Sequence, residues 1–204
     1  MSFLTEEIED FFKINGEIYH LNLAFDNVLL LLEMFNDDSI LEEKRIFLAL
    51  EMLIVEYDQL QLESMEQVYT LYKYIMKESL GYDLDKNQES DKVKSYDFQK
   101  DAELIFASFF AAYNMDLIEQ KGKLHWKKFI ALLSNLDEKT AFKKVVNIRT
   151  MKIPKANDHN KDDVAQLRKA KEVYSLDNRP AEEKINDTFN AVAHAFKGAK
   201  KAGE

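Results

Sequence analysis

Four side chains that could bind a metal or move a proton fall within one short stretch of the chain: Asp97, Asp101, Glu119 and His125. Asp97 and Asp101 are four residues apart, so a helix would place both carboxylates on one face. Carboxylates and imidazoles are common metal ligands, but no Glu-x-x-His or His-x-x-x-His spacing links these four residues. Helix capping and surface charge explain them more simply, and we predict no metal site.

The neighbouring pair His125 and Trp126 raises the question of catalysis. A catalytic histidine needs a nucleophile and an orienting carboxylate, and the chain has no Gly-x-Ser-x-Gly motif. It also has no glycine-rich phosphate loop. The simpler interpretation is an indole in the core, preceded by a histidine that uses one ring nitrogen on the backbone at a helix start. We therefore expect no enzymatic activity and no cofactor.

A cluster of basic residues suggests a third kind of chemistry, phosphate binding; it consists of Lys143, Lys144, Arg149, Lys152 and Lys155. The side chains between them, such as Ile148 and Met151, offer no aromatic platform for stacked bases. The sequence pI is about 5.1. Nucleic-acid binding is therefore the less favoured alternative.

The composition favours a helical protein that works by contact. The 204 residues are 46% hydrophobic and 12% aromatic, which is enough for a sizeable core, and only 5 are glycine and 2 proline. The absence of cysteine excludes disulfides and thiolate chemistry. The longest apolar run, Val28 to Leu32, is far too short to span a membrane, and the acidic N-terminus lacks the basic region of a signal peptide. We expect a cytoplasmic protein without a membrane partner.

Charge is distributed unevenly along the chain. Residues 1–98 carry 8 Lys+Arg and 22 Asp+Glu, whereas residues 99–204 carry 20 and 15. The acidic and basic halves could attract each other within one molecule or head to tail between copies. Two ordinary solvated surfaces are the alternative explanation.

The first 81 residues predict a hairpin followed by three helices. Asn15-Gly16 lies between two short alternating stretches, the typical sequence of a type I′ hairpin turn, with Phe12, Ile14 and Tyr19 expected on its apolar face. A helix from Asn22 to Phe35 follows. Capping signals at Ser39–Glu42 and Ser64–Gln67 begin the next two helices, and Gly81 ends the last.

A polar segment at residues 82–95 predicts an acidic linker to a helical bundle at 96–176, and an amphipathic helical tail at 177–204 follows. In the bundle, Asp97 is the expected N-cap of a helix that is apolar on more than one side, and Asp137 is the expected cap of a later helix. We predict a mainly α fold, a helical bundle with a short N-terminal β-hairpin. The predicted core residues are Phe98, Phe106, Phe109, Trp126 and Phe129.

Partner binding is expected on the free apolar side of the Asp97 helix and on the outer charged residues near the end of the bundle. The candidate residues are Phe110, Arg149 and Lys152.

One stretch, from Tyr96 to Pro154, resembles a family from phages and prophages of Gram-positive bacteria, the phage gene-product-fifteen proteins. The matching residues are Tyr96, Asp97, Phe98, Lys100, Asp101, Ala102, Ile105, Phe106, Ala107, Ser108, Phe109, Tyr113, Gly122, Leu124, His125, Trp126, Phe129, Met151, Lys152, Ile153 and Pro154. With the N-terminal hairpin, the resemblance covers residues 10–176. The chain departs from the expected family pattern at Asn114, where we expect glycine in relatives, and at Lys127, where a second aromatic is common.

The resemblance implies a role in phage tail assembly, because genes of this family lie between those of the tail tube and tape measure proteins. It implies a tail assembly chaperone in the host cytoplasm that binds the tape measure protein and keeps it soluble. It also implies self-association and further contacts with other tail proteins. A structural component of the finished tail remains the alternative.

Overall fold

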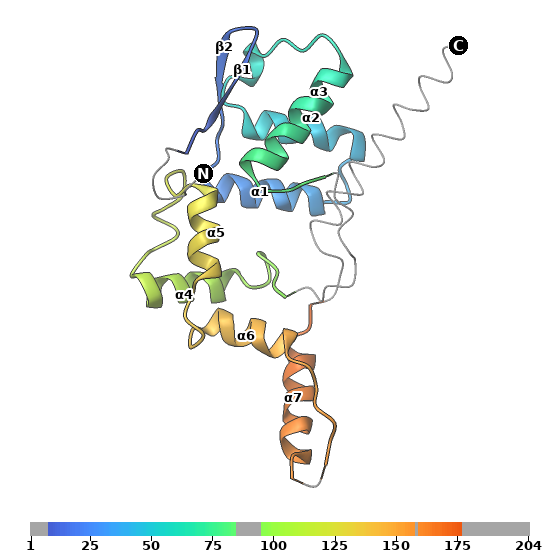
Figure 1. Ribbon diagram of the computed structural model, residues 1–204, viewed down its shortest axis with the longest axis vertical. Helices are drawn as coiled ribbons and strands as arrows, with labels where there is room; N and C mark the ends of the chain where they lie inside the picture. The colour runs from blue at the N-terminus through green and yellow to red at the C-terminus, as the bar shows by residue number, and fades with distance from the viewer. Residues whose placement is uncertain (1–7, 85–94, 158, 177–204) are drawn as a thin grey trace, which may run out of the picture. The chain divides into compact units, whose positions relative to one another are not determined.

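The computed structural model describes residues 8–84, 95–157 and 159–176 (Figure 1). The expected tail at 177–204 and residues 85–94 of the expected linker lie outside them. The described elements are strands β1 (Phe11–Ile14) and β2 (Glu17–His20), α-helices α1 (Phe25–Asn36), α2 (Glu42–Leu53), α3 (Met65–Tyr74), α4 (Ala102–Tyr113), α5 (Trp126–Ser134), α6 (Ala141–Thr150) and α7 (Lys161–Val173), the 3₁₀ turn η1 (Tyr57–Gln59) and the π-helical turn η2 (Ile75–Ser79). The predicted fold class, mainly α with a short N-terminal hairpin, is confirmed.

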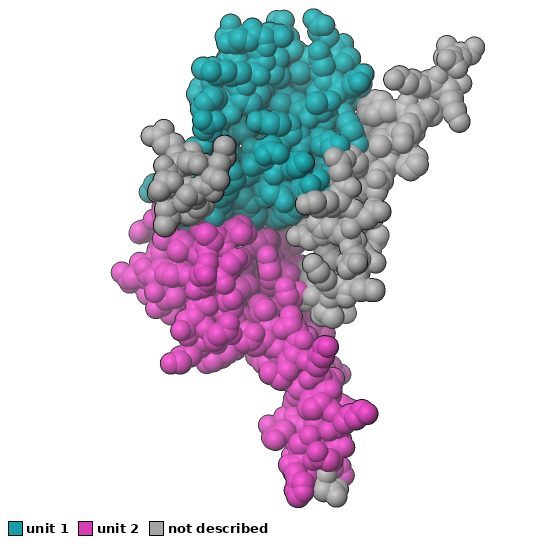
Figure 2. Space-filling view, viewed as in Figure 1, with its two compact units in different colours: residues 1–88, 122–127, 181–204 teal, residues 89–121, 128–180 magenta. Residues whose placement is uncertain are grey.

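The chain forms two compact units, coloured separately in Figure 2. Of the described residues, unit 1 comprises 8–84 and 122–127, and unit 2 comprises 95–121, 128–157 and 159–176. We had assigned the segment 122–127 to the second bundle. Within the described residues, no helix is both long and apolar enough to cross a bilayer.

The hairpin of unit 1 forms at Asn15-Gly16, as predicted. Both residues have positive φ, 54° and 89°, which a type I′ turn requires. The strands pair in antiparallel register, with Phe12 opposite Tyr19, and these two rings stack at 5.4 Å. Both side chains are buried, which fixes the apolar face of the hairpin against the rest of unit 1.

The core of unit 1 is formed by the apolar stripes of α1, α2, α3 and η2. Side chains with no exposed surface include Val28, Leu31, Phe35, Leu50, Leu53, Tyr72, Ile75 and Met76. Ser64 accepts a hydrogen bond from Gln67 N–H at 3.3 Å, so the predicted cap of α3 is confirmed. The predicted Ser39–Glu42 capping box is wrong, because α2 begins after Leu41 without a side-chain cap.

Helix α1 begins at Phe25, three residues after the predicted Asn22 cap, because the backbone before it pairs with the segment 122–127. Ala24 and His125 form an antiparallel bridge. Phe25 N–H donates to Leu124 C=O at 2.9 Å, and Trp126 N–H donates to Leu23 C=O at 2.8 Å. The segment thus adds a short extended piece to unit 1.

In unit 2, α4 packs on α6, and α6 packs on α7. Helix α4 ends at Asn114, whose φ of 50° places it in the left-handed region at the C-cap. Glycine and asparagine are the residues that adopt this conformation most readily. Asparagine therefore suits the end of the helix at this position. Helix α6 is capped by Thr140, whose hydroxyl accepts from Lys143 N–H, and not by Asp137 as predicted.

Candidate partner-binding surface

The two sides of α4 differ sharply in exposure. Ile105, Ser108 and Phe109 are buried, whereas Phe110 is 52% exposed. Ala107 and Ala111 flank Phe110 on the exposed side, and the half-buried Phe106 stacks with Phe110 at 6.4 Å. We call this set of four residues the α4 face. It is an apolar helix surface with small residues beside a large aromatic one.

The buried side of α4 anchors the aromatic core of unit 2. Phe109 stacks with Phe129 at 5.3 Å and meets Tyr113 edge-on at 5.6 Å. The Tyr113 hydroxyl donates a hydrogen bond to Leu132 C=O at 2.8 Å, and burial raises the pKa of this phenol. Ser108 accepts from Phe142 N–H at 3.0 Å, so a helix of the same unit satisfies a free backbone donor at the start of α6.

The five predicted core residues divide into two groups. Phe109, Trp126 and Phe129 are buried as predicted, while Phe98 and Phe106 are only half-buried. Trp126 belongs to unit 1, through the backbone pairing of its segment, and not to the bundle in which we expected it.

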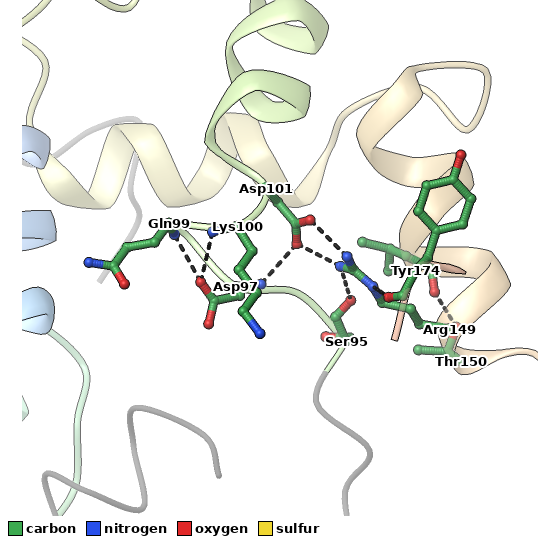
Figure 3. A network of polar contacts seen from close by, with 9 residues as sticks. Ser95, Asp97, Gln99, Lys100, Asp101, Arg149, Thr150 and Tyr174 are labelled. Carbon is green, nitrogen blue, oxygen red and sulfur yellow. Dashed lines mark hydrogen bonds and ion pairs between the residues drawn. The ribbon is translucent and has the colours of Figure 1, made fainter. Parts of the chain in front are cut away.

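Arg149 does not lie on the outer surface, and that expectation was wrong. Its side chain is 7% exposed and forms a two-point ion pair with Asp101, at 2.6 and 2.8 Å (Figure 3). Nε donates to Tyr174 C=O at 2.6 Å, and Nη1 also donates to Ser95 C=O at 3.3 Å. Lys171 donates to the carbonyl of Arg149 at 2.6 Å. The guanidinium therefore joins the end of α6, the start of α4 and the end of α7.

Asp101 both accepts a backbone hydrogen bond in the turn before α4 and balances the charge of Arg149. Its carboxylate accepts from Asp97 N–H at 2.9 Å, and the Asp97 carboxylate accepts from the N–H groups of Gln99 and Lys100, each at 3.0 Å (Figure 3). Asp97 thus caps the turn that precedes α4, and not α4 itself as predicted. Asp101 lies at the positive end of the α4 dipole, and Arg149 in the last turn of α6, so each helix dipole favours its charge.

His125 uses one ring nitrogen on the backbone at a helix start, as predicted. Its Nδ1 accepts from Lys127 N–H at 2.9 Å, at the start of α5. Nε2 therefore carries the proton and donates to the Asp10 carboxylate at 2.9 Å. In the described parts of the chain, no three His, Cys, Asp or Glu side chains are grouped so that they could hold a metal ion.

Lys152 is exposed, as expected of a contact residue, and so are its neighbours Met151 (52%) and Ile153 (44%). The rest of the basic cluster is not a uniform patch, since Arg149 is buried and Lys143 donates to Ser134 C=O at 2.9 Å. The five residues of this cluster therefore do not form one continuous exposed row of cations.

Sequence analysis missed the exposed apolar pair Met151 and Ile153, although both are visible in the chain as alternating residues before Pro154. It also missed a groove of about 800 Å³ in unit 1, between β1 and α3, because its walls come from residues about 50 positions apart.

Comparison with family models gives a match over most of the chain. No curated protein and no solved structure matches this chain. The sequence matches the family described as bacteriophage Gp15 protein over residues 4–176, which includes both units, the α4 face and the Asp101–Arg149 pair. This family suggests a structural or assembly role in a phage. The chain therefore belongs to the bacteriophage Gp15 protein family.

Proposed function

We propose that this protein is a tail assembly chaperone that binds the tape measure protein in the host cytoplasm and keeps it soluble until the tail tube encloses it. The observation that carries the proposal is the α4 face. Its Phe110 ring is 52% exposed, and the alanines beside it leave room for another helix.

The chemistry of the expected partner fits such a face. A tape measure is a long helical chain whose apolar stripes would aggregate while they are exposed to water. A helix can lay its apolar stripe against the α4 face, with the Phe106 and Phe110 rings as anchors. Ala107 and Ala111 let the two backbones approach closely, and many copies of this protein would cover a long stripe.

The firm attachment of α4 supports the same role. Phe109, Ser108 and Asp101 hold the buried side of the helix, through the Phe129 ring, the Phe142 amide and the Arg149 guanidinium. A face presented by an already ordered helix loses little conformational freedom on binding, which favours affinity.

Co-expression of the tape measure protein from the same phage with and without this chain tests the proposal. We expect the tape measure protein to become soluble and to co-purify with this chain. Unchanged solubility and no complex would overturn it.

The competing structural role gives a different result in purified particles. A chaperone should be absent from finished tails, whereas a tail component should be present in a fixed copy number. Mass spectrometry of purified phage separates the two. Nucleic-acid binding would instead give retention on DNA that falls steeply as salt is raised.

A further inference from the structure

The two outer edges of the N-terminal hairpin differ in their hydrogen bonding. The outer edge of β2 is occupied: His20 C=O accepts from Val55 N–H at 2.9 Å, and His20 N–H donates to the Glu56 carboxylate at 2.7 Å. A bridge between Leu21 and Ile54 continues this contact. Unit 1 therefore closes one side of its small sheet.

The outer edge of β1 has no backbone partner within residues 8–84, 95–157 and 159–176. Leu21 N–H donates to Asp10 C=O at 2.7 Å, and bonded and non-bonded pairs alternate along an antiparallel ladder. Phe12, opposite Tyr19, therefore faces β2, while Phe11 and Lys13 turn their N–H and C=O groups outward. Among the described residues, none bonds these four groups. An open strand edge is a template for another strand.

A groove of about 800 Å³ runs beside this edge, between β1 and α3. Its apolar lining comes from Phe12, Ile14, Leu62, Leu71 and Tyr74. A strand added to β1 would direct every second side chain towards this groove, because side chains alternate along a strand. Backbone bonds to the edge would give affinity, and the groove would select apolar residues at alternate positions.

The segment that follows α6, residues 151–157, has the features of such a strand. It is non-helical and exposed throughout. In an extended chain Met151 and Ile153 share one face, and Lys152 lies on the other. Pro154 lacks an N–H, so only one edge can pair fully. That edge carries the C=O of Met151, both groups of Ile153 and the N–H of Lys155.

Charge favours the same match. The described residues of unit 1 carry 16 Asp+Glu and 7 Lys+Arg, and those of unit 2 carry 10 and 13. The segment 151–157 contributes Lys152 and Lys155 and no acidic residue. Opposite net charges attract unit 1 of one copy to unit 2 of another and raise their rate of association.

We propose that residues 151–157 of a second copy add as a strand to the open edge of β1, with Met151 and Ile153 in the groove. The contact joins two different surfaces, so copies associate head to tail, into rings or open chains. It requires no tape measure protein, and it stands or falls independently of the proposed chaperone role.

Two variants of the full-length chain test each side of the contact. Lys13→Pro removes an outward N–H from β1 without removing a bond to β2. Ile153→Asp places a charge in the apolar groove. Sedimentation across the micromolar range should show that the unaltered chain self-associates. Each variant should weaken this association by about tenfold or more, the effect of one lost hydrogen bond or one misplaced charge.

The mixture of the two variants is the decisive sample. The Lys13→Pro copy keeps its donor segment and the Ile153→Asp copy keeps its open edge, so together they should form a one-to-one dimer that grows no further. Lys13→Ala and Ile118→Asp, an exposed apolar site 65% accessible in unit 2, are the matched controls and should associate as the unaltered chain does. Circular dichroism checks that all variants fold.

Three results would overturn the proposal. The unaltered chain could remain monomeric at every concentration, as it would if the segment paired within its own chain. The mixture could remain monomeric, or the control variants could lose association as fully as the test variants do.

Discussion

One charged contact in unit 1 and one in unit 2 differ sharply in their exposure to solvent. The contact of His20 with Glu56 in unit 1 lies at the surface, with the histidine side chain 61% exposed, although unit 1 also buries the side chain of Arg45. In unit 2 the Asp101–Arg149 pair is buried, with side chains 2% and 7% exposed. An exposed pair contributes little to stability, whereas breaking a buried pair leaves an uncompensated charge. Unit 2 should therefore depend on the Asp101–Arg149 pair far more than unit 1 depends on the His20–Glu56 contact.

The largest effect is expected at the buried pair. Asp101→Asn leaves the Arg149 guanidinium without its charge partner, and we expect it to lower the free energy of unfolding by about 4 kcal/mol. Urea denaturation followed by circular dichroism measures the change. Asp58→Asn, at an exposed position in unit 1, is the control and should change stability by less than about 0.5 kcal/mol. A loss below about 1 kcal/mol for Asp101→Asn would contradict the contrast between the units.

Adjacent phenylalanines on α4 provide the next test. Phe109 has no exposed surface, so Phe109→Ala should lower stability by about 3 kcal/mol through a cavity next to Phe129. Phe110→Ala removes a half-exposed ring and should cost less than about 1 kcal/mol. Thermal unfolding of both variants makes the comparison. Equal losses would mean that the α4 face is part of the core.

Removing a buried hydroxyl in unit 1 should change the free energy of unfolding by a smaller amount, and should raise it. Tyr72 is fully buried, and its hydroxyl has no hydrogen-bond partner among the described residues; burial raises the pKa of this phenol. Tyr72→Phe removes an unsatisfied polar group, and we expect it to stabilise the protein by about 1 kcal/mol. A lower stability of the variant in urea denaturation would contradict this prediction, because it would mean that the hydroxyl forms a hydrogen bond in the folded protein.

Lowering the pH should reduce the stability contributed by the exposed His20–Glu56 contact, and only slightly. Hydrogen bonds from His20 hold the pKa of the Glu56 carboxyl below its usual value of 4.5. A depressed folded pKa contributes stability above the unfolded pKa, and this contribution is lost as pH falls through the folded value. Glu56→Gln should therefore flatten the stability curve slightly below pH 4.5. Identical curves for the variant and the parent chain would show that the pair contributes nothing.

Local sequence predicted the elements whose signals lie within a few residues. Asn15-Gly16 supplies the two positive φ values of the hairpin turn, and Ser64 reaches Gln67 three residues on. These features depend on steric preference and short-range bonding, which the chain itself displays.

Pairings between distant residues were not predictable in this way. Arg149 was placed at the surface because its charge gave no sign of Asp101, 48 positions away, and a buried arginine needs such a partner. The segment 122–127 was assigned to the bundle because its pairing with residues 23–25 is a backbone contact and leaves no pattern in the side chains. The N-cap of α6 was also predicted wrongly, because two candidate caps precede this helix and Thr140 lies nearer to its first residue than Asp137 does.

The most direct test of the proposed function is the solubility of the tape measure protein when it is co-expressed with two matched variants. Phe110→Asp places a charge on the α4 face, and Ile118→Asp places the same charge on an exposed apolar residue of the same unit outside that helix. We expect Phe110→Asp to fold normally and to lose the tape measure protein to the insoluble fraction, while Ile118→Asp keeps it soluble. Equal soluble yields with both variants would contradict binding through the α4 face.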